Sequence, residues 1–120
     1  MLSEPGQLKI ALINVLILYG RPVEAEVFDA YFTEKHRPLL VGIPKIEQMS
    51  INYIAGVAQG DAPYYLIVEL QFASESDMQE GLNSEKGQEM ARDLSQFASG
   101  GSTILFAYNT TEILEAGTAT

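Results

Sequence analysis

Apolar residues along the chain fall into four segments with the spacing of β-strands. Residues 9–19 form a nearly continuous aliphatic run, which predicts a strand with both faces buried. Imperfect alternation over 46–55 and clear alternation over 64–72 predict two further strands, and 103–108 predicts a fourth. In the third strand Glu69 belongs to the less apolar face, so a carboxylate is expected near the middle of the sheet.

The first helical region follows Pro22, which suits the first turn of a helix. Pro38 is predicted to interrupt this helix, because proline lacks an amide hydrogen and disfavours helical angles in the residue before it. In this helical region apolar side chains and a histidine recur at every fourth position and so fall on one face. The stripe that they form is predicted to pack on the sheet. Its members are Phe28, Phe32, His36 and Leu40.

The second helical region is predicted as two pieces, capped by Ser74 and Ser84. In the longer piece the charged residues, Asp93 among them, are assigned to the solvent-exposed face. The order strand, helix, strand, strand, helix, strand predicts an α+β, ferredoxin-like βαββαβ fold with a four-stranded antiparallel sheet. We expect one domain over 8–109, with terminal arms at 1–7 and 110–120.

Composition changes the picture at the open face of this sheet. The chain is 47% apolar and only 19% charged, against about 25% charged in an average soluble domain. Because the first strand is apolar on both faces, a second copy of the chain is expected to cover the open face.

Charge and residue types exclude several classes of partner. Sixteen acidic against seven basic side chains give a net charge of -9, which disfavours nucleic acids and anionic membranes. No apolar run is long enough to span a membrane, and the absence of cysteine fits a reducing, cytoplasmic location. With no cysteine, one histidine and no nucleotide-binding fingerprint, we expect neither a metal nor a cofactor.

Short motifs spread over residues 10–108 resemble the EthD-like family of small dimeric α+β barrel proteins. No single motif is specific, but their order and spacing together are. The motifs are Leu18-Tyr19-Gly20-Arg21-Pro22, Phe28-Asp29-Ala30-Tyr31, Tyr31-Phe-Thr-Glu-Lys-His36-Arg-Pro38-Leu39, Ala62-Pro-Tyr-Tyr65, Val68-Glu69-Leu70-x-Phe72, Ser84-Glu-Lys-Gly87-Gln and Phe97-Ala-x-Gly-Gly101.

The resemblance implies a homodimer whose two sheets face each other, with a ligand pocket between sheet and helices in each subunit. Related barrels include muconolactone-type isomerases, polyketide cyclases and cofactor-free monooxygenases, and the fold alone does not choose among them. The chain departs from the family at Lys45, where a glycine often follows Ile-Pro, and this leaves the geometry of that turn open.

His36 is the first catalytic candidate, because imidazole exchanges a proton near neutral pH. The alternative is a structural histidine that hydrogen-bonds free carbonyls at the helix end. The hydroxyls of Tyr19, Tyr31 and Tyr65 are candidates for binding a ligand, although tyrosines in a small core usually pack their rings and satisfy one hydroxyl.

Glu69 is the second catalytic candidate, either as a base or by orienting His36. Its alternative is a structural hydrogen bond to a strand residue such as Asn52 or Gln71, since a buried carboxylate needs a partner. Asn52 is also included among the ligand-binding candidates.

The sequence therefore favours a homodimer that acts on a small apolar or aromatic oxygenated metabolite in catabolism. His36 would transfer a proton in an isomerase, lyase or cyclase reaction, or in a cofactor-independent oxidation. The alternative is a non-catalytic binding or accessory protein of a degradation pathway.

Overall fold

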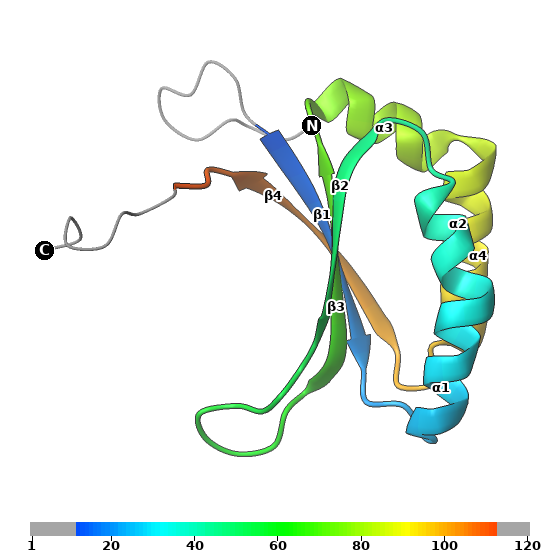
Figure 1. The fold of residues 1–120 in the computed structure, drawn as a ribbon, viewed down its shortest axis with the longest axis vertical. Coiled ribbons are helices and arrows are strands. Elements are labelled where there is room, and N and C mark those ends of the chain that lie inside the picture. Colours follow the sequence, from blue (N-terminus) through cyan, green and yellow to red (C-terminus); the bar gives the residue numbers. More distant parts are fainter. Residues whose placement is uncertain (1–11, 113–120) are drawn as a thin grey trace, which may run out of the picture.

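The fold is a four-stranded antiparallel sheet with helices packed on one of its faces (Figure 1). The computed structural model describes residues 12–112, and the strands lie in the order β2-β3-β1-β4. In chain order the elements are β1 (Leu12–Gly20), α1 (Ala25–Tyr31), a π-helical turn η1 (Phe32–His36), α2 (Arg37–Val41), β2 (Ile46–Tyr53), β3 (Tyr64–Phe72), α3 (Glu75–Asn83), α4 (Glu85–Phe97) and β4 (Ser102–Asn109).

This architecture confirms the predicted α+β, ferredoxin-like class. β3 has the predicted bounds, and the helix caps are also confirmed, since Ser74 Oγ accepts from the Asp77 amide and Ser84 Oγ from the Gly87 amide, both at 3.1 Å. Parts of three predicted segments lie outside the described residues. They are the first residues of the first strand, 9–11, the arm at 1–7, and residues 113–120 of the second arm.

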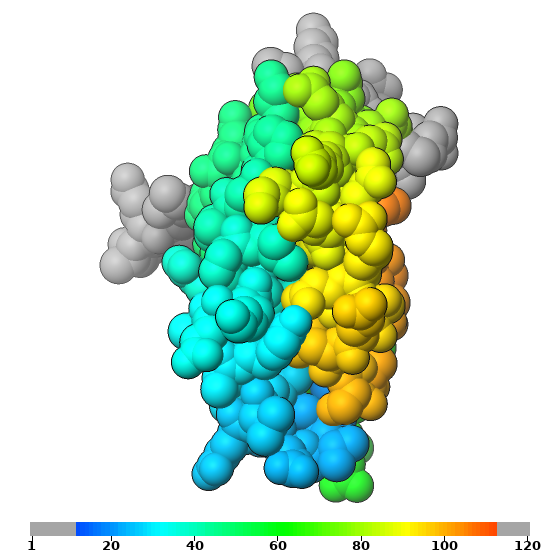
Figure 2. Space-filling view, turned by 90° about the vertical axis from the view of Figure 1, so that its right-hand side faces the viewer, coloured from blue at the N-terminus to red at the C-terminus, as the bar shows by residue number. Residues whose placement is uncertain are grey.

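The core lies between the sheet and the helices. α1 and α2 lie beside α4 on the helical face of the molecule, which Figure 2 shows. The predicted helical stripe is buried, with no member more than 4% exposed. The sheet side chains that meet it from β1 and β3 are fully buried: Ile13, Val15, Ile17, Tyr19, Leu66, Val68, Leu70 and Phe72.

The prediction that Pro38 interrupts the first helical region was wrong, because the chain stays helical through this residue. Arg37 keeps helical angles (φ -55°, ψ -43°), and the helical path continues into α2 with Pro38 near its start. The adjustment is the π-helical turn η1, in which the Arg37 amide donates to the Phe32 carbonyl one residue further back than in an α-helix. One extra residue in this turn accommodates the proline and places His36 at its end.

Two other local predictions are corrected or explained by the structure. Pro22 precedes α1 and does not open it, because the helix begins at Ala25 with Glu24 as its N-cap. Lys45 has a φ of 75°, a left-handed conformation that L-residues with a side chain adopt at a cost. The glycine that the EthD-like resemblance puts after Ile-Pro would adopt this angle freely.

Candidate functional site

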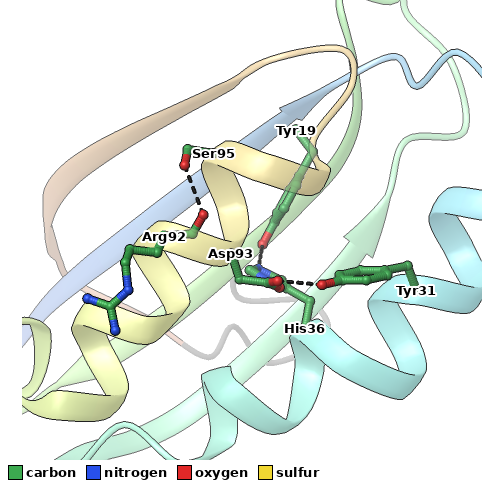
Figure 3. A network of polar contacts seen from close by, with 6 residues as sticks. All are labelled: Tyr19, Tyr31, His36, Arg92, Asp93 and Ser95. Atoms are coloured by element: carbon green, nitrogen blue, oxygen red, sulfur yellow. Dashed lines mark hydrogen bonds and ion pairs between the residues drawn. The ribbon is translucent and has the colours of Figure 1, made fainter.

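Four polar side chains form a continuous hydrogen-bonded chain under the helices, which we call the His36 network: Tyr19, Tyr31, His36 and Asp93 (Figure 3). The Tyr19 hydroxyl lies 2.8 Å from His36 Nε2, and His36 Nδ1 lies 2.9 Å from Asp93 Oδ2. The Tyr31 hydroxyl donates to the other carboxylate oxygen, Asp93 Oδ1, at 2.5 Å. The network therefore joins β1, η1, α1 and α4.

Burial determines where the protons of this network lie. His36 is fully buried, which lowers its pKa, and the hydrogen bond and charge of Asp93 act in the opposite direction. A neutral imidazole carries one ring hydrogen, and the Asp93 carboxylate can only accept it. Nδ1–H therefore donates to Asp93, and Nε2 accepts the hydroxyl hydrogen of Tyr19. Burial, with the charge of Asp93, raises the pKa of Tyr19, which keeps this hydroxyl protonated.

Aromatic rings hold His36 in this orientation. Its ring lies 4.5 Å from the ring of Phe97 on α4 and 5.7 Å from that of Phe32, one helical turn back. The Tyr19 ring meets the imidazole edge to face. His36 is thus enclosed by the core, with none of its surface exposed to solvent.

Asp93 is the functional candidate that sequence reasoning missed. It was assigned to the exposed helical face, but its side chain is only 13% exposed and bonds to His36 and Tyr31. The signal was its spacing, because Asp93 comes three residues after Met90 and four before Phe97. Residues at these spacings share one helix face, so Asp93 borders the buried stripe.

An apolar groove lies next to the outer end of the network. Its volume is about 300 Å³, and Tyr31 and Phe97, whose rings stack at 4.9 Å, form one of its walls. We call it the α1–α4 groove, lined by Val23, Glu24, Val27, Phe28, Tyr31, Phe97 and Ser99. Val23 is 81% exposed and Val27 62%, which leaves two apolar side chains in contact with water at its rim.

Close backbone contact between two glycines shapes the end of this groove. A Cβ atom on Gly20 would lie 2.0 Å from the Gly100 carbonyl oxygen, so the strand end and the loop before β4 touch directly. This contact brings Val23 to Ser99, whose Oγ accepts from the Val23 amide at 3.0 Å.

Tyr65 belongs to a separate cluster. Strict alternation along the third strand puts Tyr65 on the same, less apolar face as Glu69, but its hydroxyl lies 2.9 Å from both carboxylate oxygens of Asp29 on α1. The pairing shifts register beside Tyr65, since Tyr19 pairs with Leu66 and Gly20 with Tyr64. Such a bulge re-aims a side chain, and here it turns the tyrosine toward the helix.

Glu69 lies on the opposite face of the sheet from His36, so the idea that it orients His36 was wrong; Asp93 occupies that place. Its partner is a strand amide, as the structural alternative expected, but the residue is Asn14 on β1 at 3.5 Å. A hollow of about 320 Å³ on this open face includes Glu69, Gln71 and Asn109. Asn52 is not part of the lining of this hollow, and its side-chain amide donates to the Ile67 carbonyl.

Neither a metal-binding cluster nor a membrane-spanning helix occurs among the described residues. Within residues 12–112, no group of three or more His, Cys, Asp or Glu side chains is arranged to hold a metal ion. No helix in the described part of the chain is long and apolar enough to cross a membrane.

Comparison with known sequences gives two matches that cover most of the chain. A family model described as "EthD domain" matches residues 21–101. The second match is to an uncharacterized 11.0 kDa protein of Rhodococcus erythropolis, named for its place in the thcB-thcC intergenic region. It is 30% identical over 95 residues, which are 79% of this chain and 92% of that protein.

Comparison with solved structures gives likenesses of fold. An EthD family protein from Bacillus halodurans is 23% identical with a TM-score of 0.78, covering 82% of this chain and 99% of that one. A dimeric ferredoxin-like protein of unknown function from Thermobifida fusca is 12% identical (TM-score 0.59; 89% and 99% covered). A hydroxynitrile lyase from Passiflora edulis is 13% identical (TM-score 0.65; 87% and 97% covered).

Proposed function

Because the chain belongs to the EthD family, we propose that it binds a small apolar or aromatic oxygenated metabolite in the α1–α4 groove. One observation carries this proposal: an apolar groove adjoins the His36 network and has Tyr31 of that network in its wall. Ligand pockets typically combine an apolar lining with a few fixed polar groups, and this groove has both.

The same arrangement supports proton transfer by the His36 network, in which Asp93 takes up the proton and His36, whose Nδ1 already carries a hydrogen, positions the carboxylate. The imidazole is buried and reaches the groove through Asp93 and Tyr31, so a proton exchanged with a bound molecule passes along these two side chains. Asp93 receives or returns the proton at the oxygen facing Tyr31, while Nδ1–H of His36 holds its other oxygen. An isomerase, lyase or cofactor-independent oxidoreductase needs such a step.

We further propose that the active form is a homodimer whose open sheet faces cover each other. On this face Leu105 of β4 is 47% exposed, and Leu16 of β1, which pairs with it, is half-buried, as is Ile67 of β3, an excess of apolar surface for a face open to water. The dimeric neighbour from Thermobifida fusca has the same fold. The cysteine-free composition supports a cytoplasmic location for this catabolic role.

Binding is tested by a thermal-shift screen of lactones and hydroxyquinones against three proteins: wild type, Val27→Asp and Val41→Asp. Val27 lines the groove, whereas Val41 is a similarly exposed valine outside it. Compounds that bind in the groove should raise the Tm of wild type and Val41→Asp but not of Val27→Asp. An equal rise in all three proteins would place binding elsewhere.

Catalysis is tested with Asp93→Asn, whose side-chain amide has nearly the same shape as the carboxylate but cannot take up a proton. If the proposal of proton transfer is right, the variant binds the compounds found in the screen and fails to convert them. Conversion at the wild-type rate would overturn that role. Binding without conversion by the wild-type protein would favour the alternative, a non-catalytic accessory protein of a degradation pathway.

A further inference from the structure

The hydrogen bonds of the His36 network leave one unused acceptor beside the groove. The carboxylate of Asp93 has no proton to give, and it accepts from both Tyr31 O–H and His36 Nδ1–H. His36 Nε2 in turn accepts from Tyr19. Each donor of the network is therefore committed inward, toward Asp93 or His36. Tyr31 also lines the groove, so its oxygen can offer lone pairs to a molecule bound there but no hydrogen.

From this direction of the hydrogen bonds we infer that the groove selects neutral molecules whose hydroxyl group donates to the Tyr31 oxygen, and that it rejects anions. The inference deepens the proposed function and rests on it. A carbonyl or ether oxygen in the same place would face a second acceptor and gain no hydrogen bond. An alcohol, phenol or enol supplies the missing hydrogen, so hydroxyl-bearing compounds are the favoured class.

The charges around the groove account for the exclusion of anions. Glu24 lines the groove, and the Asp93 carboxylate lies one hydrogen bond behind Tyr31. Within residues 12–112 Lys86 Nζ lies within 4.0 Å of a carboxylate, that of Glu89, and no lysine or arginine nitrogen lies that close to the carboxylate of Glu24 or of Asp93. A phenolate or carboxylate would therefore meet negative charge as well as an acceptor.

The groove walls indicate the shape of the rest of the molecule. Phe97 stacks with Tyr31 at 4.9 Å and with Phe28 at 5.1 Å, and Val27 covers the rim. A flat apolar body fits between such surfaces. A para-alkylated phenol combines this body with a single hydroxyl, which makes it a suitable probe.

The test compares the dissociation constants of 4-propylphenol and its methyl ether, 4-propylanisole, for the full-length protein by calorimetry. The two probes have the same ring and alkyl chain and differ in that a methyl group replaces the hydroxyl hydrogen in the ether. We expect the phenol to bind about tenfold more tightly, the effect of one hydrogen bond to an acceptor polarised by a carboxylate. Tyr31→Phe should bring the ratio close to one by weakening the phenol alone.

A matched control separates the effect of removing the Tyr31 hydroxyl from the groove from the general effect of losing a hydrogen bond between a tyrosine and a carboxylate. Tyr65→Phe removes the same kind of bond, to Asp29, at a place outside the groove, and it should keep the tenfold ratio. Circular dichroism and thermal unfolding report whether each variant folds. If Tyr31→Phe does not fold, the wild-type ratio of phenol to ether still decides the question.

The outcomes distinguish this inference from the proposed function. Equal binding of phenol and ether, or tighter binding of the ether, would overturn the hydroxyl requirement and leave the proposed groove intact. Absence of binding by both probes, together with a failed thermal-shift screen, would overturn both. With 4-nitrophenol, whose acidity allows it to ionise near neutrality, affinity should fall at least tenfold as the phenolate forms; unchanged affinity would refute the exclusion of anions.

Protein groups do not obscure this last comparison. The titratable groups that face the Tyr31 hydroxyl are Asp93 from α4, His36 behind it and Glu24 at the start of α1. The hydrogen bond to Asp93 raises the pKa of Tyr31, and burial lowers that of His36. Both stay in their neutral forms across neutral pH, so a change in affinity there reports the ionisation of the probe.

Discussion

The two faces of the sheet carry two different polar clusters. The hydrogen bonds of the cluster on the helix-covered face are complete within one chain, whereas the cluster on the open face is left facing a hollow. On the helix-covered face, the His36 network is buried and every hydrogen-bonding atom of the imidazole has a partner. On the open face, Glu69 is half-buried, with a single amide partner at 3.5 Å and a hollow in front of it.

The comparison teaches that the two catalytic candidates belong to separate sites. The sheet lies between His36 and Glu69, so neither can assist the other. A closed network can hold a proton in one place because its surroundings are fixed. The open cluster, by contrast, takes its final environment from whatever covers the face, which we propose to be a second copy.

The largest effect is expected from Leu16→Asp on the open face. Leu16 pairs with Glu69 on one side and Leu105 on the other, so the substitution puts a second carboxylate beside the first in the proposed interface. We expect dimer affinity to fall at least a hundredfold, an effect of about 3 kcal/mol. Light scattering checks it, with circular dichroism as the control for folding. An undiminished dimer would show that this face is not the interface.

On the helix-covered face, Asp93→Ala should cost about 2–3 kcal/mol of unfolding free energy. The substitution leaves the buried Nδ1–H of His36 without an acceptor and also frees Tyr31. Tyr31→Phe, which keeps the His36–Asp93 bond, should cost about 1 kcal/mol. Urea unfolding measures both variants. Equal costs would mean that His36 does not depend on Asp93, contrary to a closed network.

The lowered pKa of His36 predicts that the free energy of unfolding falls between pH 7.5 and 5.5, by no more than about 1.4 kcal/mol. In the unfolded chain the imidazole takes up a proton near its usual pKa of about 6.5, whereas the native state takes it up only at lower pH. The unfolded state therefore binds more protons in this window, and stability falls as the pH falls below about 6.5.

Denaturant unfolding at the two pH values checks this prediction. His36 is the single histidine of the chain, so His36→Asn should remove most of the difference. If the variant keeps the same pH dependence, the imidazole is not the group responsible.

The smallest effect concerns Lys45, which lies in the turn that leads from the helices to β2. Its left-handed φ of 75° costs about 1–2 kcal/mol, and glycine gives back part of this through its freer unfolded chain. Lys45→Gly should therefore stabilise the protein by about 0.5–1 kcal/mol in urea unfolding. Lys45→Ala is the control, and an equal gain from it would exclude the backbone as the cause.

Periodicity predicted the order of elements, the bounds of β3 and the buried stripe that contains His36, because a repeat of two or four residues records which face is covered. Periodicity missed the features that depend on local irregularities of the backbone. The π-helical turn kept Arg37 helical, and a bulge turned Tyr65 toward Asp29. Asp93 was missed for another reason: a charged residue at the border of a buried stripe has the pattern of an exposed one.

The proton position of His36 is the most direct test of the account, because the direction of the whole network follows from it. Long-range ¹H–¹⁵N NMR of the protein labelled at its single histidine resolves the two ring nitrogens. At neutral pH we expect a neutral ring with the hydrogen on Nδ1 and a non-protonated Nε2, as the contacts to Asp93 and Tyr19 require. A charged ring, or a hydrogen on Nε2 alone, would contradict the account.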